Sequence, residues 1–359
     1  MKALVLTEYN KFEYLDVETP TPKEDEVLLR IEACAVCGSD VHGMDGSSGR
    51  RQPPVIMGHE AAGQVAAVGA KVTDLQVGDR VTFDSTVYCN RCPSCKKGNV
   101  NLCTDRQVLG VSCDDYRRNG AFAEYMTVPS YICYKLPDSV SYVQAAMVEP
   151  MAIAYHAATR TPIEAGMSVV IVGVGTIGLL TLQIAKAMGA NPIIAVDIDQ
   201  AKLDTALGNG ASHAINSNDP DALAKILEAT PNKEGVDIAF DATGIDATVN
   251  LSVRSVKLNG AIVLIGNLAQ NTNFPLQWVV TRQLSLFGTC ASAGEYPECL
   301  RLIAEKKVDV EALISKVVPL EDGHEWITRV YNREDGLNKI VVCPTPTEAP
   351  TSTPTPENN

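Results

Sequence analysis

The chain has 359 residues, enough for two or three domains of about 100 to 200 residues, with cores that need no disulfides. Hydrophobic residues make up 45% and charged residues 20%, which is typical of a globular protein and excludes a disordered or fibrous one. Lysine and arginine total 30 against 43 aspartates and glutamates, so the net charge of −13 argues against nucleic acids and anionic membranes as partners.

The apolar segments are too short for export or membrane insertion. The N-terminal run turns polar at Thr7, and the run from Val169 to Leu182 falls short of the roughly 20 residues that span a bilayer. The eleven cysteines are therefore expected to be thiols or metal ligands in a reducing compartment rather than disulfides. We expect a cytoplasmic protein.

The first 150 residues form short segments in which apolar and polar residues alternate. Val27, Leu29 and Ile31 fall on one side of such a segment, and Leu28 and Arg30 fall on the other. This period of two is typical of strands, and the glycines and aspartates between segments are typical of turns. The pattern predicts a small β domain or barrel with few helices.

From about residue 166, apolar runs alternate with helical stretches, as in βαβ units. The first helix is predicted from Thr176 to Met188 and ends before Gly189. Six strands are predicted, at Ser168 to Val172, Pro192 to Ile198, Ala211 to Ile215, Val236 to Phe240, Gly260 to Ile265 and Leu284 to Phe287. Six such strands favour a parallel sheet of the Rossmann type with two mononucleotide-binding halves.

The last part of the chain changes pattern again. Helices are predicted near Pro297 to Lys306 and Glu321 to Tyr331, followed by a strand at Lys339 to Cys343. This segment is expected to pack back on the first domain. The tail from Pro344 to Asn359 contains five prolines and five threonines with few apolar residues, so we expect it to be disordered.

A glycine-rich turn follows the first strand of the predicted parallel sheet. Gly173, Gly175 and Gly178 form a GxGxxG motif with Thr176 and Ile177 at the start of a helix, where backbone NH groups can bind a pyrophosphate. Asp197 stands at the end of the next strand, placed to accept hydrogen bonds from ribose hydroxyls and to repel a 2′-phosphate. These residues predict an NAD site in preference to an NADP site, although an aspartate here can also cap a helix.

Four cysteines lie within fifteen residues, in the pattern C-x2-C-x2-C-x7-C: Cys89, Cys92, Cys95 and Cys103. Four thiolates at this spacing can surround one tetrahedral ion, which favours a structural zinc with no open position. Iron–sulfur ligation and paired disulfides are the alternatives. Such a site does no chemistry itself, but its metal-binding energy stabilises a loop that has little core.

A second set of metal-binding residue types stands nearer the N-terminus. Cys37 begins the motif Cys-Gly-Ser-Asp-Val-His, which contains Ser39 and His42, and Gly58 precedes His59 and Glu60. A thiolate, an imidazole and a carboxylate leave a fourth zinc position open, as a catalytic zinc requires. Each residue alone is uninformative, because single cysteines and histidines are commonly core or structural residues.

These motifs occur together with Gly78-Asp-Arg-Val81 and Glu149-Pro150 in the order found in zinc-dependent medium-chain alcohol and polyol dehydrogenases, which the chain resembles from residue 1 to about 343. The resemblance implies an α/β Rossmann cofactor domain and a GroES-like, β-barrel-type catalytic domain. The implied ranges are 1–153 for the catalytic domain with its zinc loop at 89–103, 154–288 for the cofactor domain, 289–343 for the return and 344–359 for the tail.

The resemblance also implies roles for single residues. Cys37 and His59 match catalytic zinc ligands, and Glu60 and Glu149 each match a third ligand or a close neighbour of the metal. Ethanol-type relatives carry a cysteine at the position of Glu149 and polyol-type relatives a glutamate, which favours the sorbitol, sugar-alcohol and threonine dehydrogenase branch. Which of the two glutamates touches the metal is left open.

The implied reaction is NAD-linked oxidation of a secondary hydroxyl. Zinc would hold the substrate as an alkoxide, which donates a hydride to the nicotinamide C4, while Ser39, the ribose hydroxyl and His42 pass the proton to solvent. Further cofactor contacts are expected at Lys202, Thr243, Ile265, Gly266 and Thr289. Lys339 stands where relatives carry a basic residue, but we interpret it as a solvated surface lysine.

The substrate is less well defined than the reaction. Sorbitol-type relatives hold substrate hydroxyls with an arginine that the segment Gly288 to Ala293 lacks, so strict sorbitol specificity is doubtful. Arg50, Arg51, Arg117 and Arg118 could instead bind the phosphate of a sugar-alcohol phosphate, as in galactitol-phosphate dehydrogenases. L-Threonine dehydrogenation, a zinc-free quinone reductase and a non-catalytic binding protein are further alternatives. Relatives are commonly dimers or tetramers, so a homo-oligomer is expected.

Overall fold

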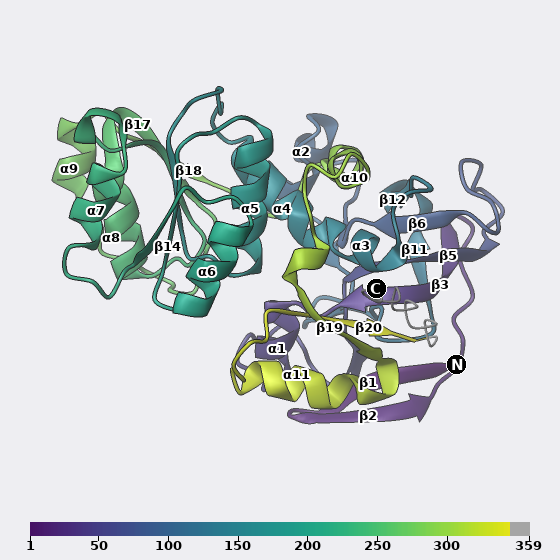
Figure 1. Ribbon diagram of the computed structural model, residues 1–359. Helices are drawn as coiled ribbons and strands as arrows, with labels where there is room; N and C mark the ends of the chain where they lie inside the picture. Colours follow the sequence, from purple (N-terminus) through teal and green to yellow (C-terminus); the bar gives the residue numbers. More distant parts are fainter. Residues whose placement is uncertain (345–359) are drawn as a thin grey trace, which may run out of the picture.

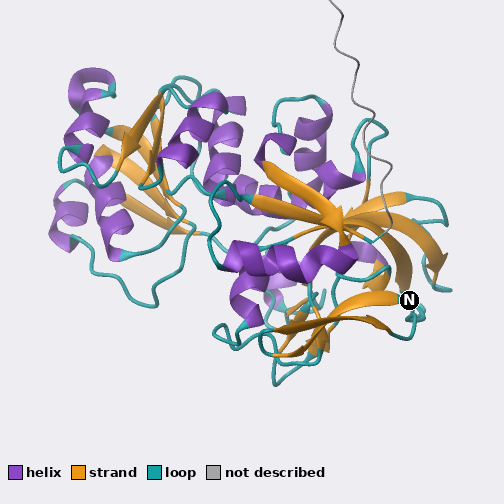
Figure 2. Cartoon of the chain, turned by 60° about the horizontal axis from the view of Figure 1, so that its bottom comes forward, coloured by secondary structure: helices purple, strands orange, loops and turns teal. Residues whose placement is uncertain are grey.

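The computed structural model describes residues 1–344, which form two halves (Figure 1). One half contains a parallel sheet with helices on both sides, and the other is built mainly of antiparallel strands and loops (Figure 2). Residues 345–359, which hold nearly all of the tail predicted to be disordered, lie outside the described part. Within residues 1–344, no helix has the length and apolarity needed to cross a bilayer.

The antiparallel half is organised around a seven-stranded sheet with the order β12-β6-β5-β3-β20-β19, in which β11 also pairs with β3. Val27, Leu29 and Ile31 are fully buried while Arg30 is exposed, which confirms the predicted alternation. A small sheet, β2-β1-β4, lies beside it. The strands from the first part of the chain are β1 (Lys2–Glu8), β2 (Lys11–Asp16), β3 (Glu26–Ala35), β4 (Val55–Ile56), β5 (Glu60–Val68), β6 (Arg80–Phe83), β11 (Tyr125–Pro129) and β12 (Cys133–Lys135).

Short elements connect these strands. Two small ladders pair β7 (Thr86–Val87) with β8 (Gln107–Val108) and β9 (Val111–Ser112) with β10 (Arg117–Arg118). The helices of this half are α1 (Gly38–Met44), α2 (Pro93–Lys96), α3 (Tyr142–Ala146) and α4 (Val148–Ala158), with single 3-10 turns at Val100–Leu102 and Ser130–Ile132. The expectation of few helices is confirmed.

The other half contains six parallel strands in the order β15-β14-β13-β16-β17-β18. All six predicted strands are present, as β13 (Val169–Val172), β14 (Ile193–Asp197), β15 (His213–Asn216), β16 (Val236–Asp241), β17 (Val256–Leu264) and β18 (Ser285–Gly288). β17 starts four residues earlier than predicted, because the chain leaves the preceding helix directly in an extended conformation at Val256. The order reverses beside β13, and ligands bind at such a switch point.

Helices cover both faces of the parallel sheet. Val169 and Ile171 of β13 face one core together with α5 (Thr176–Ala187) and α6 (Gln200–Gly208). Val170 and Val172 face the opposite core together with α7 (Ala222–Glu228) and α8 (Asp246–Ser255). The short helix α9 (Leu276–Thr281) precedes the edge strand β18. Helix α5 has the predicted bounds to within one residue and ends before Gly189, which has a φ of +94°.

The last segment returns to the antiparallel half, as predicted. Its elements are α10 (Tyr296–Ala304), β19 (Ile314–Pro319), α11 (Gly323–Tyr331) and β20 (Lys339–Cys343). β20 pairs antiparallel with β3, where Val341 lies opposite Ala35, and β19 extends the sheet beyond it. Figure 1 shows α11, β19 and β20 beside β1 and β3, from which they are far in sequence, whereas α10 lies next to α2 and α4.

A single apolar core connects the two halves. It contains Ala33 and Val341 of the antiparallel sheet, Met151 of α4 and Ile171 of the parallel sheet. Helix α4 packs against α5, so the predicted division between residues 153 and 154 falls inside a helix that contacts both halves. The junction of the halves is therefore well packed.

Candidate active site and its family

Two chain turns bring three candidate metal ligands together at the edge of the antiparallel half. Cys37 caps the N-terminus of α1, where its Sγ accepts a hydrogen bond from the backbone NH of Ser39 (3.4 Å). His59 and Glu60 follow Gly58, whose φ is +88°. A Cβ at Gly58 would lie 2.7 Å from the Phe122 ring, so this turn requires glycine.

The donor atoms of Cys37, His59 and Glu60 all lie within 4.8 Å of one another. His59 and Glu60 are buried and Cys37 is partly exposed, and Cys37 and Glu60 line a cavity. A thiolate, an imidazole and a carboxylate at this spacing fit a zinc ion that keeps one open position. The structure therefore brings together three of the four residues predicted to surround the catalytic metal.

Glu149 lies near this group but outside its 4.8 Å limit. Its Oε1 accepts a hydrogen bond from the Ser85 hydroxyl (2.8 Å), and its Oε2 is buried with no hydrogen-bond partner. Burial raises the pKa of Glu149 to about 7; the neighbouring His59 lowers it and Glu60 raises it. The geometry thus favours Glu60 over Glu149 as the carboxylate beside the thiol and the imidazole.

Asp40 lies behind the metal-binding group and was not among the predicted site residues. Its Oδ1 is 3.4 Å from His59 Nδ1, and its Oδ2 accepts a hydrogen bond from the Cys37 backbone NH (3.2 Å). Burial would raise the pKa of Asp40, but His59 and Arg51 lower it below its ordinary value. Burial would likewise lower the pKa of His59, but Asp40 and Cys37 raise it. A carboxylate in this position orients a ligating histidine.

Lys339 corrects the sequence interpretation. It is only 4% exposed and forms an ion pair with Glu60, so it is not a solvated surface lysine. Lys339 is the first residue of β20, and the pairing of β20 with β3 places it behind the site. Burial would lower the pKa of Lys339, but the carboxylate of Glu60 raises it. The error arose because this pairing joins residues more than 270 positions apart, and no local pattern reports it.

Ser39 and His42 occupy helix α1. The Ser39 hydroxyl lies 3.5 Å from His59 Nε2, at the candidate metal site. His42 is one helical turn further along and is exposed. No hydrogen bond joins the two side chains directly within residues 1–344, so a relay between them requires an intervening hydroxyl.

A cavity of about 560 Å³ lies between the two halves of the molecule. Most of the predicted cofactor residues line it, together with Cys37, Glu60 and Lys339: Gly173, Gly175, Thr176, Ile177, Gly178, Asp197, Lys202 and Thr243. Ile265, Gly266 and Thr289 do not line it, although Gly266 packs directly on Thr243, where a Cβ would lie 2.2 Å from backbone. The metal-binding group and the glycine turn therefore open into one cleft.

Backbone geometry explains the glycines of the turn. Gly173 has a φ of +89°, and a Cβ at Gly178 would lie 1.9 Å from the Gly173 carbonyl oxygen. Asp197 accepts hydrogen bonds from the NH groups of Val174 (2.9 Å) and Ile198 (2.8 Å), and it also lines the cleft. Asp197 thus both supports the turn and presents a negative charge where a ribose would lie.

The four arginines considered for phosphate binding do not converge on the cleft. Arg51 is 3% exposed and contacts Asp40 and Ser39, so it is not available to a phosphate. Arg117 and Arg118 line a separate hollow of about 710 Å³, and Arg50 is an exposed side chain that lines neither cavity. The structure therefore does not bring these arginines together at the cleft.

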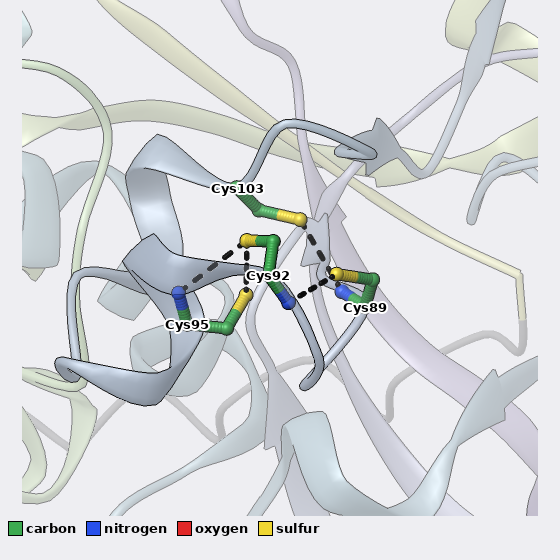
Figure 3. A group of neighbouring side chains, drawn as sticks. All are labelled: Cys89, Cys92, Cys95 and Cys103. Atoms are coloured by element: carbon green, nitrogen blue, oxygen red, sulfur yellow. Dashed lines mark hydrogen bonds between the residues drawn. The ribbon is translucent and has the colours of Figure 1, made fainter.

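The four cysteines of the loop at 89–103 face one another (Figure 3). Their sulfur atoms all lie within 4.8 Å, and the sulfurs of Cys92 and Cys95 are 3.4 Å apart. Backbone NH groups point at three of the sulfurs, including that of Cys103, which accepts from the NH of Cys89 (3.3 Å). Backbone hydrogen bonds lower the pKa of Cys92 to about 6. All eleven cysteines are free, and this arrangement fits a closed tetrahedral zinc site.

Comparison with known proteins places the chain in a family. Residues 23–138 match the alcohol dehydrogenase GroES-like domain, and residues 176–305 match the zinc-binding dehydrogenase domain. The sorbitol dehydrogenase of Bacillus subtilis (strain 168) is 35% identical over 96% of this chain and 97% of its own.

Solved structures agree with this assignment. Galactitol-1-phosphate dehydrogenase from Escherichia coli superposes with a TM-score of 0.89 at 28% identity, covering 96% of this chain and 100% of its own. A structure described as a putative zinc-binding dehydrogenase from Sinorhizobium meliloti 1021, solved with NADP bound, superposes with a TM-score of 0.88 at 30% identity. The match covers 96% of this chain and 99% of that one. The predicted resemblance, the two-domain fold, and the zinc and nicotinamide cofactors are confirmed. The chain belongs to the zinc-binding alcohol dehydrogenase family, whose members pair a GroES-like domain with a Rossmann-type cofactor domain.

Proposed function

We propose that the protein oxidises a secondary hydroxyl of a polyol or sugar alcohol to the ketose, with NAD as the hydride acceptor. The convergence of Cys37, His59 and Glu60, of which Cys37 and Glu60 line the same cleft as the glycine turn, carries this proposal. Glu149 supports the polyol branch, because it adds a second carboxylate beside the group. The name of the Bacillus subtilis relative supports the same substrate class.

Cys37, His59 and Glu60 are the residues that would hold a catalytic zinc, and Cys89, Cys92, Cys95 and Cys103 those that would hold a structural one. A bound catalytic zinc supplies a Lewis acid that lowers the pKa of a substrate hydroxyl. Glu149 stands next to this group with one free carboxylate oxygen, suitable for a hydrogen bond from a substrate hydroxyl or from water.

Ser39 and His42 are proposed to remove the proton. The Ser39 hydroxyl is at the metal-binding group and can accept a proton from the substrate, while the exposed His42 can release it to solvent. His42→Ala is expected to reduce oxidation most at acidic pH and to be partly rescued by a small buffer base. An unchanged pH profile, with no rescue, excludes His42 from the relay.

Asp197 supports a preference for NAD over NADP, because its carboxylate would repel a 2′-phosphate. The Sinorhizobium relative binds NADP, so the family accommodates both cofactors. Dissociation constants for NAD⁺ and NADP⁺ test this point in the parent and in Asp197→Ser. Tighter binding of NADP⁺ by the parent would refute the assignment.

The substrate is tested with the zinc-loaded protein and NAD⁺ against free polyols, phosphorylated polyols, secondary alcohols and L-threonine. Turnover of free polyols that is lost after treatment with a chelator and restored by zinc supports the proposal. Turnover that survives complete metal removal refutes the mechanism. Exclusive turnover of phosphorylated polyols or L-threonine identifies one of the two alternative substrates, and no turnover of any compound favours a binding protein.

We also propose a cytoplasmic homo-oligomer. Eleven free thiols suit a reducing compartment. β18 forms an edge of the parallel sheet, and Leu276 and Val280 of the adjacent α9 are 62% and 69% exposed. Exposed edge strands are commonly covered in native proteins, and a second copy of this chain is the proposed cover. Light scattering that shows a monomer at micromolar concentration contradicts this part of the proposal.

A further inference from the structure

Arg51 is a buried cation that the proposed function leaves without a role. It is 3% exposed, although arginines are rarely buried unless they are paired. Its Nη2 lies 3.3 Å from Asp40 Oδ1 and 3.4 Å from Ser39 Oγ, and its Nη1 donates to the Arg50 carbonyl oxygen (3.2 Å). A single guanidinium nitrogen therefore touches two residues that surround the candidate metal site.

These contacts close a ring of four side chains. His59 Nδ1 is 3.4 Å from Asp40 Oδ1, which is 3.3 Å from Arg51 Nη2. The same Nη2 is 3.4 Å from Ser39 Oγ, which is 3.5 Å from His59 Nε2. Each member thus contacts two others. Because the members come from α1, from the segment after it and from the turn before β5, the ring ties three chain segments together.

Hydrogen-bonding capacity determines what Arg51 does in this ring. A guanidinium has only donors and stays charged, so both Asp40 and Ser39 must present an acceptor oxygen to it. Asp40 Oδ1, which accepts from Arg51, also faces His59 Nδ1, so it holds the imidazole with Nε2 turned toward Ser39 and the metal site. Ser39 uses one lone pair for Arg51, which leaves its proton and its other lone pair for groups at the metal site, where His59 Nε2 lies 3.5 Å away.

We propose that Arg51 is a positioning residue that sets both the ligating nitrogen of His59 and the direction of the Ser39 hydroxyl. The inference rests on the proposed function, because it assigns Arg51 to the same metal site and proton path. It also explains why an arginine next to the exposed Arg50 is buried. Arg51 neither contacts the cleft nor binds substrate; it acts through Asp40 and Ser39.

Gly43 provides a second way to disturb the same contacts. A Cβ at Gly43 would lie 2.4 Å from Arg51 Cγ, so the absence of a side chain there lets the arginine pass beneath α1. Gly43→Ala therefore shifts the Arg51 stem without removing any charge or hydrogen-bonding group. Gly208, at the end of α6, is a matched control because a Cβ there meets nothing within 4 Å.

The test compares Arg51→Met and Gly43→Ala with the parent, using Arg50→Met and Gly208→Ala as controls. Zinc affinity is measured by competition with a chromophoric chelator, and the site geometry by the visible absorption of protein in which Co²⁺ replaces zinc. We expect one of the two zinc ions to bind about 10- to 100-fold more weakly in Arg51→Met, with a changed Co²⁺ spectrum. Gly43→Ala should show a smaller change in the same direction, and both controls should bind metal like the parent.

The kinetic readout separates positioning from general damage. In Arg51→Met and Gly43→Ala, kcat should fall while the dissociation constant of NAD⁺ stays within about twofold, since no residue of the ring belongs to the glycine turn. If Arg51→Met fails to fold, Gly43→Ala decides the outcome. Parent-like zinc affinity, Co²⁺ spectrum and kcat in a folded variant overturn the inference and leave the proposed function intact. A parent protein that binds no metal at Cys37, His59 and Glu60 overturns both.

Discussion

Replacement of Lys339 by methionine removes a buried cation and leaves the carboxylate of Glu60 in place. Lys339 and Glu60 are 4% and 1% exposed, so water cannot compensate for the lost partner. Removal of one member of a buried ion pair destabilises a protein by about 3–5 kcal/mol. At about 2–4 °C per kcal/mol for a domain of 150–250 residues, the metal-free variant should melt about 6–20 °C below the parent.

Zinc changes this expectation in a measurable way. A divalent cation held by Cys37, His59 and Glu60 supplies the positive charge that the variant lacks, so the stability difference should shrink when zinc is added. If zinc reduces the difference in unfolding free energy between parent and variant, thermodynamic linkage requires that Lys339→Met binds zinc more tightly than the parent. The gain in zinc-binding free energy equals that reduction. The same residue that stabilises the metal-free site thus opposes metal binding.

The assay is denaturant unfolding and thermal melting of parent and variant, each with a chelator and with saturating zinc. Lys257→Met is the matched control, because Lys257 pairs with Asp237 at a site where its side chain is 42% exposed. Exposed pairs contribute only about 0–1 kcal/mol. Equal destabilisation by the two substitutions, or a difference that zinc leaves unchanged, would refute the role assigned to Lys339.

Three further changes test other parts of the structure. Burial raises the pKa of Asp84 from 3.8 to about 6, so the native state binds the proton more tightly and should lose about 2 kcal/mol of stability as the pH rises from 4 to 6. Asp84→Asn should remove this loss in unfolding curves across that range, and an unaltered pH dependence contradicts the assignment. Cys92→Ser should lower the zinc content by one ion per chain and lower the melting temperature, while the Co²⁺ spectrum of the other site is unchanged. Loss of both ions would show that the sites are not independent. Gly178→Ala places a Cβ 1.9 Å from the Gly173 carbonyl oxygen and should weaken NAD⁺ binding at least tenfold in calorimetry, whereas parent-like affinity would mean that the turn adapts.

Local sequence patterns were enough to predict most of the strands and the main binding motifs of this protein. The period of two in the first 150 residues predicted strands such as β3, and the six apolar runs after residue 166 predicted every strand of the parallel sheet. The glycine turn, the four cysteines and the segments around Cys37 and His59 were recognisable for the same reason. In each of these motifs, a few residues close together in sequence are enough to identify a local feature, such as a turn with positive φ, a cluster of thiolates or a helix N-terminus.

Only the tertiary structure decided how the remaining charges are paired. Lys339 was interpreted as a surface residue and Arg51 as a possible phosphate ligand, yet both are buried beside the candidate metal site. Glu60 and Glu149 were equivalent on the sequence, and the turn at Gly58 placed Glu60 with Cys37 and His59. Burial of a charge depends on which segments pack around it, and here those segments are β20 on β3 and Arg51 beneath α1. Spacing along the chain carries no information about such contacts, because they form only when distant segments pack together.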